Sequence, residues 1–132
     1  MTSITITIGI PSNKLNPNNA PMTRGGQRGL HRLRKEQKES AWKCALAALN
    51  GREAPRWPTA TVHVRLYEPN RRALGKRDQD NLIASLKGAI DGIAGAGIVL
   101  NDNGVRWGVF DLCNIDSEFP RIELTFIPEG VQ

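Results

Sequence analysis

Asp78 and Asp80, two aspartates one residue apart, are the residues of this 132-residue chain whose types and spacing best suit chemistry. They follow a basic segment and open a stretch with helical spacing. Lys87 comes seven residues after Asp80, almost two full helical turns later. An aspartate at a helix start caps free backbone N–H groups and complements the helix dipole, which accounts for one of the pair. The functional interpretation is a site for a hard divalent cation such as Mg²⁺, which prefers carboxylate oxygens and water.

A cation held by paired carboxylates beside basic residues suits phosphodiester hydrolysis, because the metal activates water and stabilises charge on phosphorus. Asp102, at a turn beyond the helix, is the third candidate ligand. Lys87 is spaced to stabilise the same charge or to orient the water. Asp91 follows Lys87 by four residues, where it can pair with the lysine on one helix face. Topology alone leaves open whether Asp102 reaches the pair within one subunit or from a second one.

The formal net charge is +5, and the positive residues are grouped rather than spread. One group precedes the aspartates and should contact a phosphate backbone: Arg71, Arg72, Lys76 and Arg77. The other extends this footprint along the first predicted helix and the loop before it: Arg24, Arg28, Arg32, Lys35 and Lys38. A solvated helix face explains the second group equally well. The asymmetry as a whole favours a nucleic-acid partner.

Alternating β-branched and apolar residues predict strands over 4–10 and 59–69, and two final strands over 105–115 and 121–128 joined as a hairpin. Helical spacing predicts helices over 27–49 and 79–94. The order is therefore β-α-β-α-β-β, in which a right-handed crossover makes the second and third strands parallel. We expect an α+β fold, with a mixed β-sheet and two main helices packed mainly on one face, as a single domain over 1–132.

Several functional classes are disfavoured by the sequence. No stretch has the length and apolar character of a membrane span. The N-terminal run "SITITIGI" lacks the basic region of a signal peptide, which favours a cytoplasmic protein. The absence of a glycine-rich phosphate loop weighs against a different Mg²⁺ phosphotransfer enzyme that acts on nucleotides.

"RDQDNLIASLKGAIDGI", followed by "AGIVLNDNGV", resembles the RusA family of Holliday-junction resolvases, which includes phage and prophage members. The family signature is D-x-D-N-L, a lysine on the following helix, an aspartate after it, and an acidic turn beyond an A-G segment. Some members carry the lysine four residues after the second aspartate, where this chain has Ala84. Lys87 lies three residues later and keeps nearly the same helical face. The acidic turn here has one carboxylate, Asp102.

The resemblance implies a homodimeric, Mg²⁺-dependent crossover junction endodeoxyribonuclease, with Mn²⁺ as a substitute ion. Such an enzyme resolves four-way DNA junctions by paired symmetric nicks in recombination and repair. The resemblance also implies that Asp78, Asp80 and Asp102 are the metal-binding and catalytic carboxylates and that Lys87 is the catalytic lysine. A two-fold dimer suits a junction with approximate two-fold symmetry. The alternative is a non-catalytic protein that keeps the fold and binds branched DNA.

Overall fold

The computed structural model describes residues 2–16, 19 and 23–130, and its elements follow the predicted order with one interruption in the second helix. The strands are β1 (Ile4–Ile8), β2 (Ala60–Glu68), β3 (Val105–Ile115) and β4 (Arg121–Pro128). The α-helices are α1 (Arg24–Leu49), α2 (Gln79–Ser85) and α3 (Lys87–Gly95). Short 3₁₀ turns form η1 (Asn13–Leu15), η3 (Arg71–Ala73) and η4 (Asp102–Gly104). In the described part of the chain, no helix has the length and apolar character to cross a membrane.

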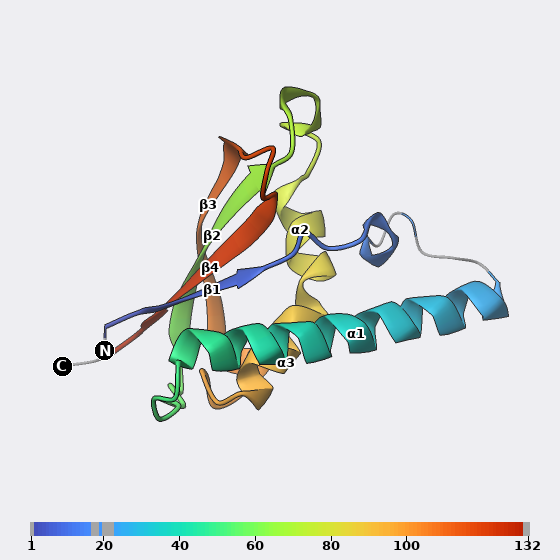
Figure 1. The fold of residues 1–132 in the computed structure, drawn as a ribbon. Helices are drawn as coiled ribbons and strands as arrows, with labels where there is room; N and C mark the ends of the chain where they lie inside the picture. The colour runs from blue at the N-terminus through green and yellow to red at the C-terminus, as the bar shows by residue number, and fades with distance from the viewer. Residues whose placement is uncertain (1, 17–18, 20–22, 131–132) are drawn as a thin grey trace.

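The four strands form one mixed sheet in the order β1-β4-β2-β3, and the helices cover one of its faces (Figure 1). β2 and β3 run parallel, as the crossover predicts. β4 pairs antiparallel with both β1 and β2. The predicted α+β class, with a mixed sheet and the main helices on one face, is confirmed.

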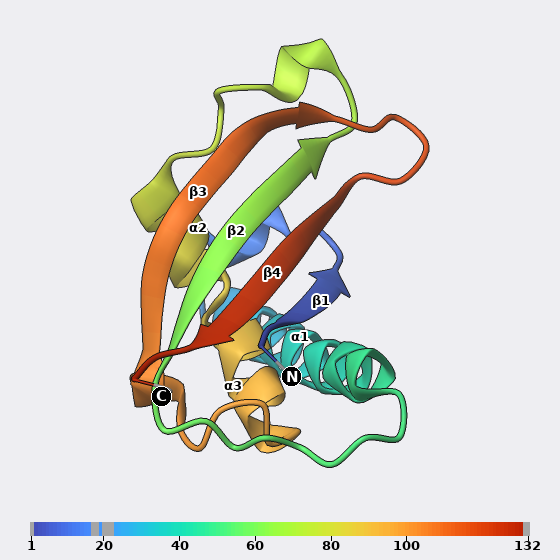
Figure 2. The same cartoon turned by 90° about the vertical axis from the view of Figure 1, so that its left-hand side faces the viewer.

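The predicted hairpin between the last two strands is wrong, because β2 lies between β3 and β4 (Figure 2). Residues 116–120 carry the chain across the carboxyl end of β2, where the Asp116 N–H donates to the Glu68 carbonyl at 2.9 Å. Every second residue of β4 from Ile122 to Phe126 is fully buried, and the strand pairs with β1 on one side and β2 on the other. β3 has no buried residue and forms an edge.

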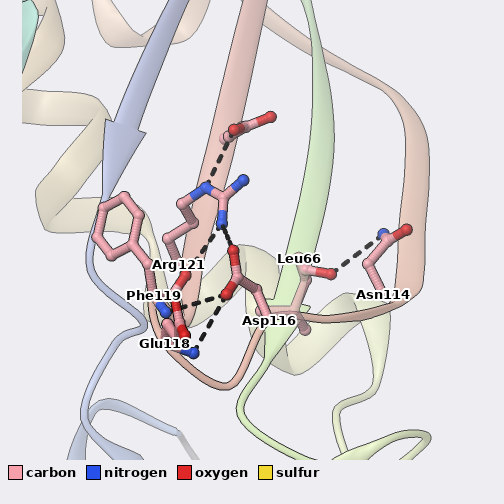
Figure 3. Close-up of polar contacts among 7 residues, drawn as sticks. Leu66, Asn114, Asp116, Glu118, Phe119 and Arg121 are labelled. Atoms are coloured by element: carbon pink, nitrogen blue, oxygen red, sulfur yellow. Dashed lines mark hydrogen bonds and ion pairs between the residues drawn. The ribbon is translucent and has the colours of Figure 1, made fainter.

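Arg121, the first residue of β4, binds the segment 116–120 to the sheet through hydrogen bonds (Figure 3). Its guanidinium donates to Asp116 at 2.8 Å and to Glu123 at 3.1 Å, and it lies 3.8 Å from the centre of the Tyr67 ring. The Arg121 hydrogen bond, followed by that of the Phe119 N–H, holds the pKa of Asp116 below its ordinary value. The turn is therefore closed by charge-assisted bonds at the carboxyl end of β2.

The hydrophobic core lies between the sheet and the helices. It contains Ile4, Ile6, Ile8, Val62, Val64, Leu66, Leu86, Ile93, Ile122, Leu124 and Phe126, all buried. Burial alternates along β1 and β2, as expected for strands with one face on the core. On the helical side, α1 lies so close to α3 that a Cβ added to Gly92 would overlap the backbone carbonyl of Lys38. Glycine at this position is therefore required by close backbone approach.

The second predicted helix is not continuous, because it breaks at Leu86 into α2 and α3. Leu86 has φ −95° and ψ 1°, and its side chain is fully buried. In an unbroken helix, the Ser85 carbonyl would accept from the amide four residues later. Here it accepts from the side-chain nitrogen of Gln37 on α1, at 2.8 Å. Asp80 and Lys87, which the spacing placed on one helix, therefore lie on two: Asp80 on α2 and Lys87 on α3.

Candidate active site

Asp78 caps the start of α2, as the structural interpretation of the aspartate pair predicts. Its Oδ1 accepts from the backbone N–H groups of Asp80 at 2.8 Å and of Asn81 at 3.4 Å. Its Oδ2 accepts from the side-chain nitrogen of Asn81 at 3.2 Å. Asp80 is exposed, and none of the other described residues contributes a hydrogen bond or an ion pair to its carboxylate. Capping therefore accounts for Asp78 and leaves the Asp80 carboxylate available.

One face of α2 lines a pocket of about 380 Å³, which we call the basic pocket. The pocket also takes residues from the loop after β1 and from the segment between β2 and α2. Three of the four cations predicted to lie nearest the aspartates line it: Arg72, Lys76 and Arg77, beside Asp78. Arg71 is exposed on the same η3 turn but is not part of the lining. Three of these four cations therefore lie beside the start of α2.

Glu68, at the end of β2, is a residue of this site that the sequence reasoning missed. It is 1% exposed, lines the basic pocket, and accepts through Oε2 from Arg77 Nε at 3.0 Å. A signal was present in the alternation of β2, since Glu68 has the same parity as the buried Val64 and Leu66. A charged residue at a core-facing position just before a basic loop indicates a buried ion pair.

The other face of α2 borders a second depression of about 210 Å³, which we call the acidic hollow. It is lined by Ile83, Ala84, Lys87, Ile90, Asp102, Val105 and Trp107. Asp80 precedes Ala84 by four residues within α2, so it lies one helical turn away on the same face. Lys87 and Asp102 therefore line the same depression, and Asp80 lies one turn before its edge on α2.

Asp102 returns to the helices, where its carboxylate meets that of Asp91 on α3. Burial, followed by repulsion from Asp102 and a hydrogen bond with it, raises the pKa of Asp91 above its ordinary value. Lys38 on α1 and Lys87 on α3 oppose this rise through their positive charge. The charges of Asp102, Lys38 and Lys87 therefore all act on Asp91, from three different segments of the chain.

The three predicted ligands do not form one cluster. Among the described residues, no group of three or more His, Cys, Asp or Glu side chains could hold a metal ion. Asp78 is turned into its capping bonds, Asp80 is exposed one turn along, and Asp102 lies with Asp91. The carboxylates that the structure brings into contact are those of Asp91 and Asp102. The sequence reasoning had assigned Asp91 to orient Lys87, not to bind metal.

The predicted basic residues of the first helix lie on α1, whose first half projects beyond the sheet (Figure 1). All five are exposed: Arg24, Arg28, Arg32, Lys35 and Lys38. No salt bridge among the described residues joins any of them to an acidic side chain. Only Lys38 is close enough to the acidic hollow to influence Asp91. The other four offer unpaired charge along an arm that leads away from the site.

Comparison with known proteins gives no family. No family model matches the chain, and no curated protein matches it. The resemblance to the RusA family therefore rests on the sequence motif from Arg77 to Val105 alone.

Proposed function

We propose that the chain is a Mg²⁺-dependent, structure-selective endonuclease of the RusA type, acting on four-way DNA junctions as a cytoplasmic homodimer. The observation that carries the proposal is the position of α2 between the basic pocket and the acidic hollow. This short helix puts cations suited to a DNA backbone within a few turns of Asp80, Lys87 and Asp102. Carboxylates beside phosphate-binding cations suit phosphodiester hydrolysis.

Asp102 in the acidic hollow and its neighbour Asp91 form a carboxylate pair that fits a hard divalent cation. Asp91 and Asp102 place two carboxylates in contact, and their mutual repulsion contributes to the raised pKa of Asp91. A divalent cation relieves such repulsion, and Mg²⁺ characteristically binds through one or two protein carboxylates with water and phosphate oxygens in the other positions. We therefore assign Asp91 and Asp102 as the protein ligands, with Asp80 the next carboxylate available. When bound, Mg²⁺ or Mn²⁺ would supply an activated water and positive charge at the phosphorus.

The remaining residues bind and orient the substrate. Lys87 lines the acidic hollow together with Asp102, so its ammonium group would stabilise negative charge on a phosphate held there. Arg72 and Lys76 are exposed on the rim of the basic pocket and would hold the adjacent backbone. The cations of α1 would extend this contact along one arm of the junction. Asp78 acts as a positioning residue, because its capping bonds fix the start of α2.

A non-catalytic protein that binds branched DNA is the second candidate. Both carboxylate oxygens of Asp78 are committed to capping bonds, which suits a structural role for this residue of the motif. Such a protein would keep salt-dependent binding through its exposed cations, because phosphate contacts release counterions. It would show no cleavage with any divalent ion.

Cleavage of a labelled synthetic four-way junction in Mg²⁺ separates the two candidates. The wild-type chain is compared with Asp80→Asn and with Asp111→Asn, a matched control. Asp111 is a β3 aspartate that pairs with Arg65 at 3.4 Å, outside both the pocket and the hollow. We expect wild type and Asp111→Asn to cut, and Asp80→Asn to bind the junction but to cut at least about 100-fold more slowly. Binding without cleavage by wild type in Mg²⁺ and in Mn²⁺ would leave only the non-catalytic candidate.

A further inference from the structure

Glu68 is a buried carboxylate with only half of its hydrogen-bonding capacity used. Its Oε2 accepts from Arg77 Nε at 3.0 Å. Its Oε1 is shielded from solvent and has no hydrogen-bond partner among the described residues. Buried polar atoms in folded proteins nearly always have a partner, because an unpaired acceptor loses its hydration without compensation. An unpaired carboxylate oxygen beside a pocket therefore indicates a place for a donor from a ligand.

The pocket beside Glu68 has the size and the lining of a small-ligand site. Its volume of about 380 Å³ lies within the range of pockets that hold small molecules. Cationic side chains line it, with Arg72 and Lys76 exposed to solvent and Arg77 partly covered. The side-chain amide of Asn81 also lines it, and its nitrogen is engaged with Asp78. The pocket thus combines a buried negative oxygen with positive charge nearer the solvent.

We propose that the basic pocket takes one unpaired nucleotide of the branched DNA, and that Glu68 selects its base. The phosphate lies against Arg72 and Lys76, and the base donates an exocyclic amino hydrogen to Glu68 Oε1. This inference rests on the proposed function, since it names the part of the DNA that occupies the pocket. A base at the point of strand exchange would leave its stack to enter the pocket, at the unstacking cost of a few kcal/mol that base-flipping proteins meet.

The chemistry of Glu68 predicts which bases are accepted. A carboxylate oxygen accepts from the amino group of cytosine, adenine or guanine. Thymine lacks an exocyclic amino group, and its one ring donor, N3–H, is flanked by two carbonyl oxygens that the carboxylate repels. Arg77 donates to Glu68 through Nε, so its two terminal nitrogens remain available to donate to the phosphate of the nucleotide. The Arg77 side chain is 28% exposed, so it can shift toward the solvent. This shift would open the way for a donor of the ligand to reach the shielded Oε1 of Glu68.

Binding of two mononucleotides, dCMP and dTMP, tests the proposal without any cleavage step. Isothermal titration of the full chain should show dCMP binding about tenfold more tightly than dTMP, the difference expected for one hydrogen bond to a charged acceptor. In Glu68→Gln the preference should fall to about onefold, because the amide can also donate to the carbonyls of thymine. Arg72→Gln should weaken both nucleotides by the same factor and keep the preference.

A matched control separates this role from general damage to the sheet. Glu123 pairs with Arg121 Nε at 3.1 Å, the same type of bond as that of Glu68, but it lies outside the basic pocket. Glu123→Gln should leave the affinities of both nucleotides unchanged. Equal binding of dCMP and dTMP by wild type, or a preference that survives in Glu68→Gln, would overturn the proposal. If Glu68→Gln does not fold, an unchanged nucleotide affinity in Arg72→Gln overturns it instead.

Junction cleavage and nucleotide binding test the proposed nuclease and the proposed nucleotide pocket independently. Junction cleavage by wild type together with no binding of either nucleotide would refute the nucleotide pocket alone. Selective dCMP binding by a chain that cuts no junction would refute the nuclease and keep the pocket.

Discussion

Replacing Gly92 with alanine should push α3 away from α1. The close packing of these two helices is what brings Lys38 near Asp91. A Cβ added to Gly92 would overlap the carbonyl oxygen of Lys38 and would lie 3.0 Å from the backbone nitrogen of Trp42. Both obstacles are backbone atoms of α1, so neither can turn aside as a flexible side chain would. The two helices must move apart by roughly 1 Å, a gap that forfeits a quarter to a half of each contact's dispersion energy.

The expected cost follows from two opposing terms. Overpacking of a close-packed contact costs about 1–3 kcal/mol, and backbone obstacles place Gly92→Ala at the upper end. Alanine is favoured over glycine inside a helix by about 0.5–1 kcal/mol, which offsets part of this cost. The net loss is about 2 kcal/mol of unfolding free energy. For a chain of this length, the loss lowers the melting temperature by about 8 °C.

Gly29→Ala is the matched control, because it makes the same change in a helix where no atom of another described segment lies within 4 Å of the new methyl group. Gly29 is in the half of α1 that projects beyond the sheet (Figure 1). Here only the propensity term acts, so the melting temperature should rise by about 2–4 °C. Thermal unfolding of both variants, followed by circular dichroism, measures the two shifts. Equal shifts of the same sign would refute the close approach of α1 and α3.

Gly108→Ala should destabilise the β2–β3 pair by about 1–3 kcal/mol in urea unfolding, because its Cβ would lie 2.5 Å from the Nδ1 of His63, which accepts a ladder N–H. Wild-type stability of this variant would contradict the close approach of Gly108 to His63. The lowered pKa of Asp116 means that its bond with Arg121 stabilises the fold above the ordinary carboxyl pKa, and that this contribution disappears as pH falls through the folded-state pKa. Asp116→Asn should therefore be less stable than wild type at pH 7, and the two should converge in acid; a gap that does not depend on pH would contradict this assignment. Mg²⁺ should raise the melting temperature of wild type but not of Asp102→Asn, and an equal rise in both would place the cation elsewhere.

The strands could be predicted from the sequence because alternation is a local property of the backbone. Side chains point to opposite faces in turn, so the apolar parity of β1 and β2 identifies their core faces. The same parity runs on to Glu68, which was not singled out from the sequence. Extending the alternation by one step would have placed this carboxylate in the interior.

The strand order and the helix break could not be predicted locally. A link of five residues, 116–120, fits a hairpin as well as a crossing over β2, and the burial of β4 against neighbours on both sides decides between them. Leu86 fits the apolar spacing of an unbroken helix. The break is stabilised by Gln37, which satisfies the Ser85 carbonyl from 48 residues away in the sequence. Contacts at such separations leave no local pattern.

The candidate site was predicted in part for the same reason. Spacing alone indicated that one aspartate would cap a helix, and Asp78 does so. Spacing could not show that Asp102 would meet Asp91, because this contact depends on the path that the chain takes after α3. The two depressions that α2 borders likewise depend on residues from several elements, so no local spacing could show them.

Mapping the nicks made in a synthetic four-way junction tests the central claim most directly. Each of the four strands is labelled in turn, and products formed by the wild-type chain in Mg²⁺ are resolved on a denaturing gel. The account predicts paired nicks at symmetric positions in two opposing strands, with unbranched duplex of the same sequence left intact. An uncut junction, or cuts made equally in the unbranched duplex, would contradict it.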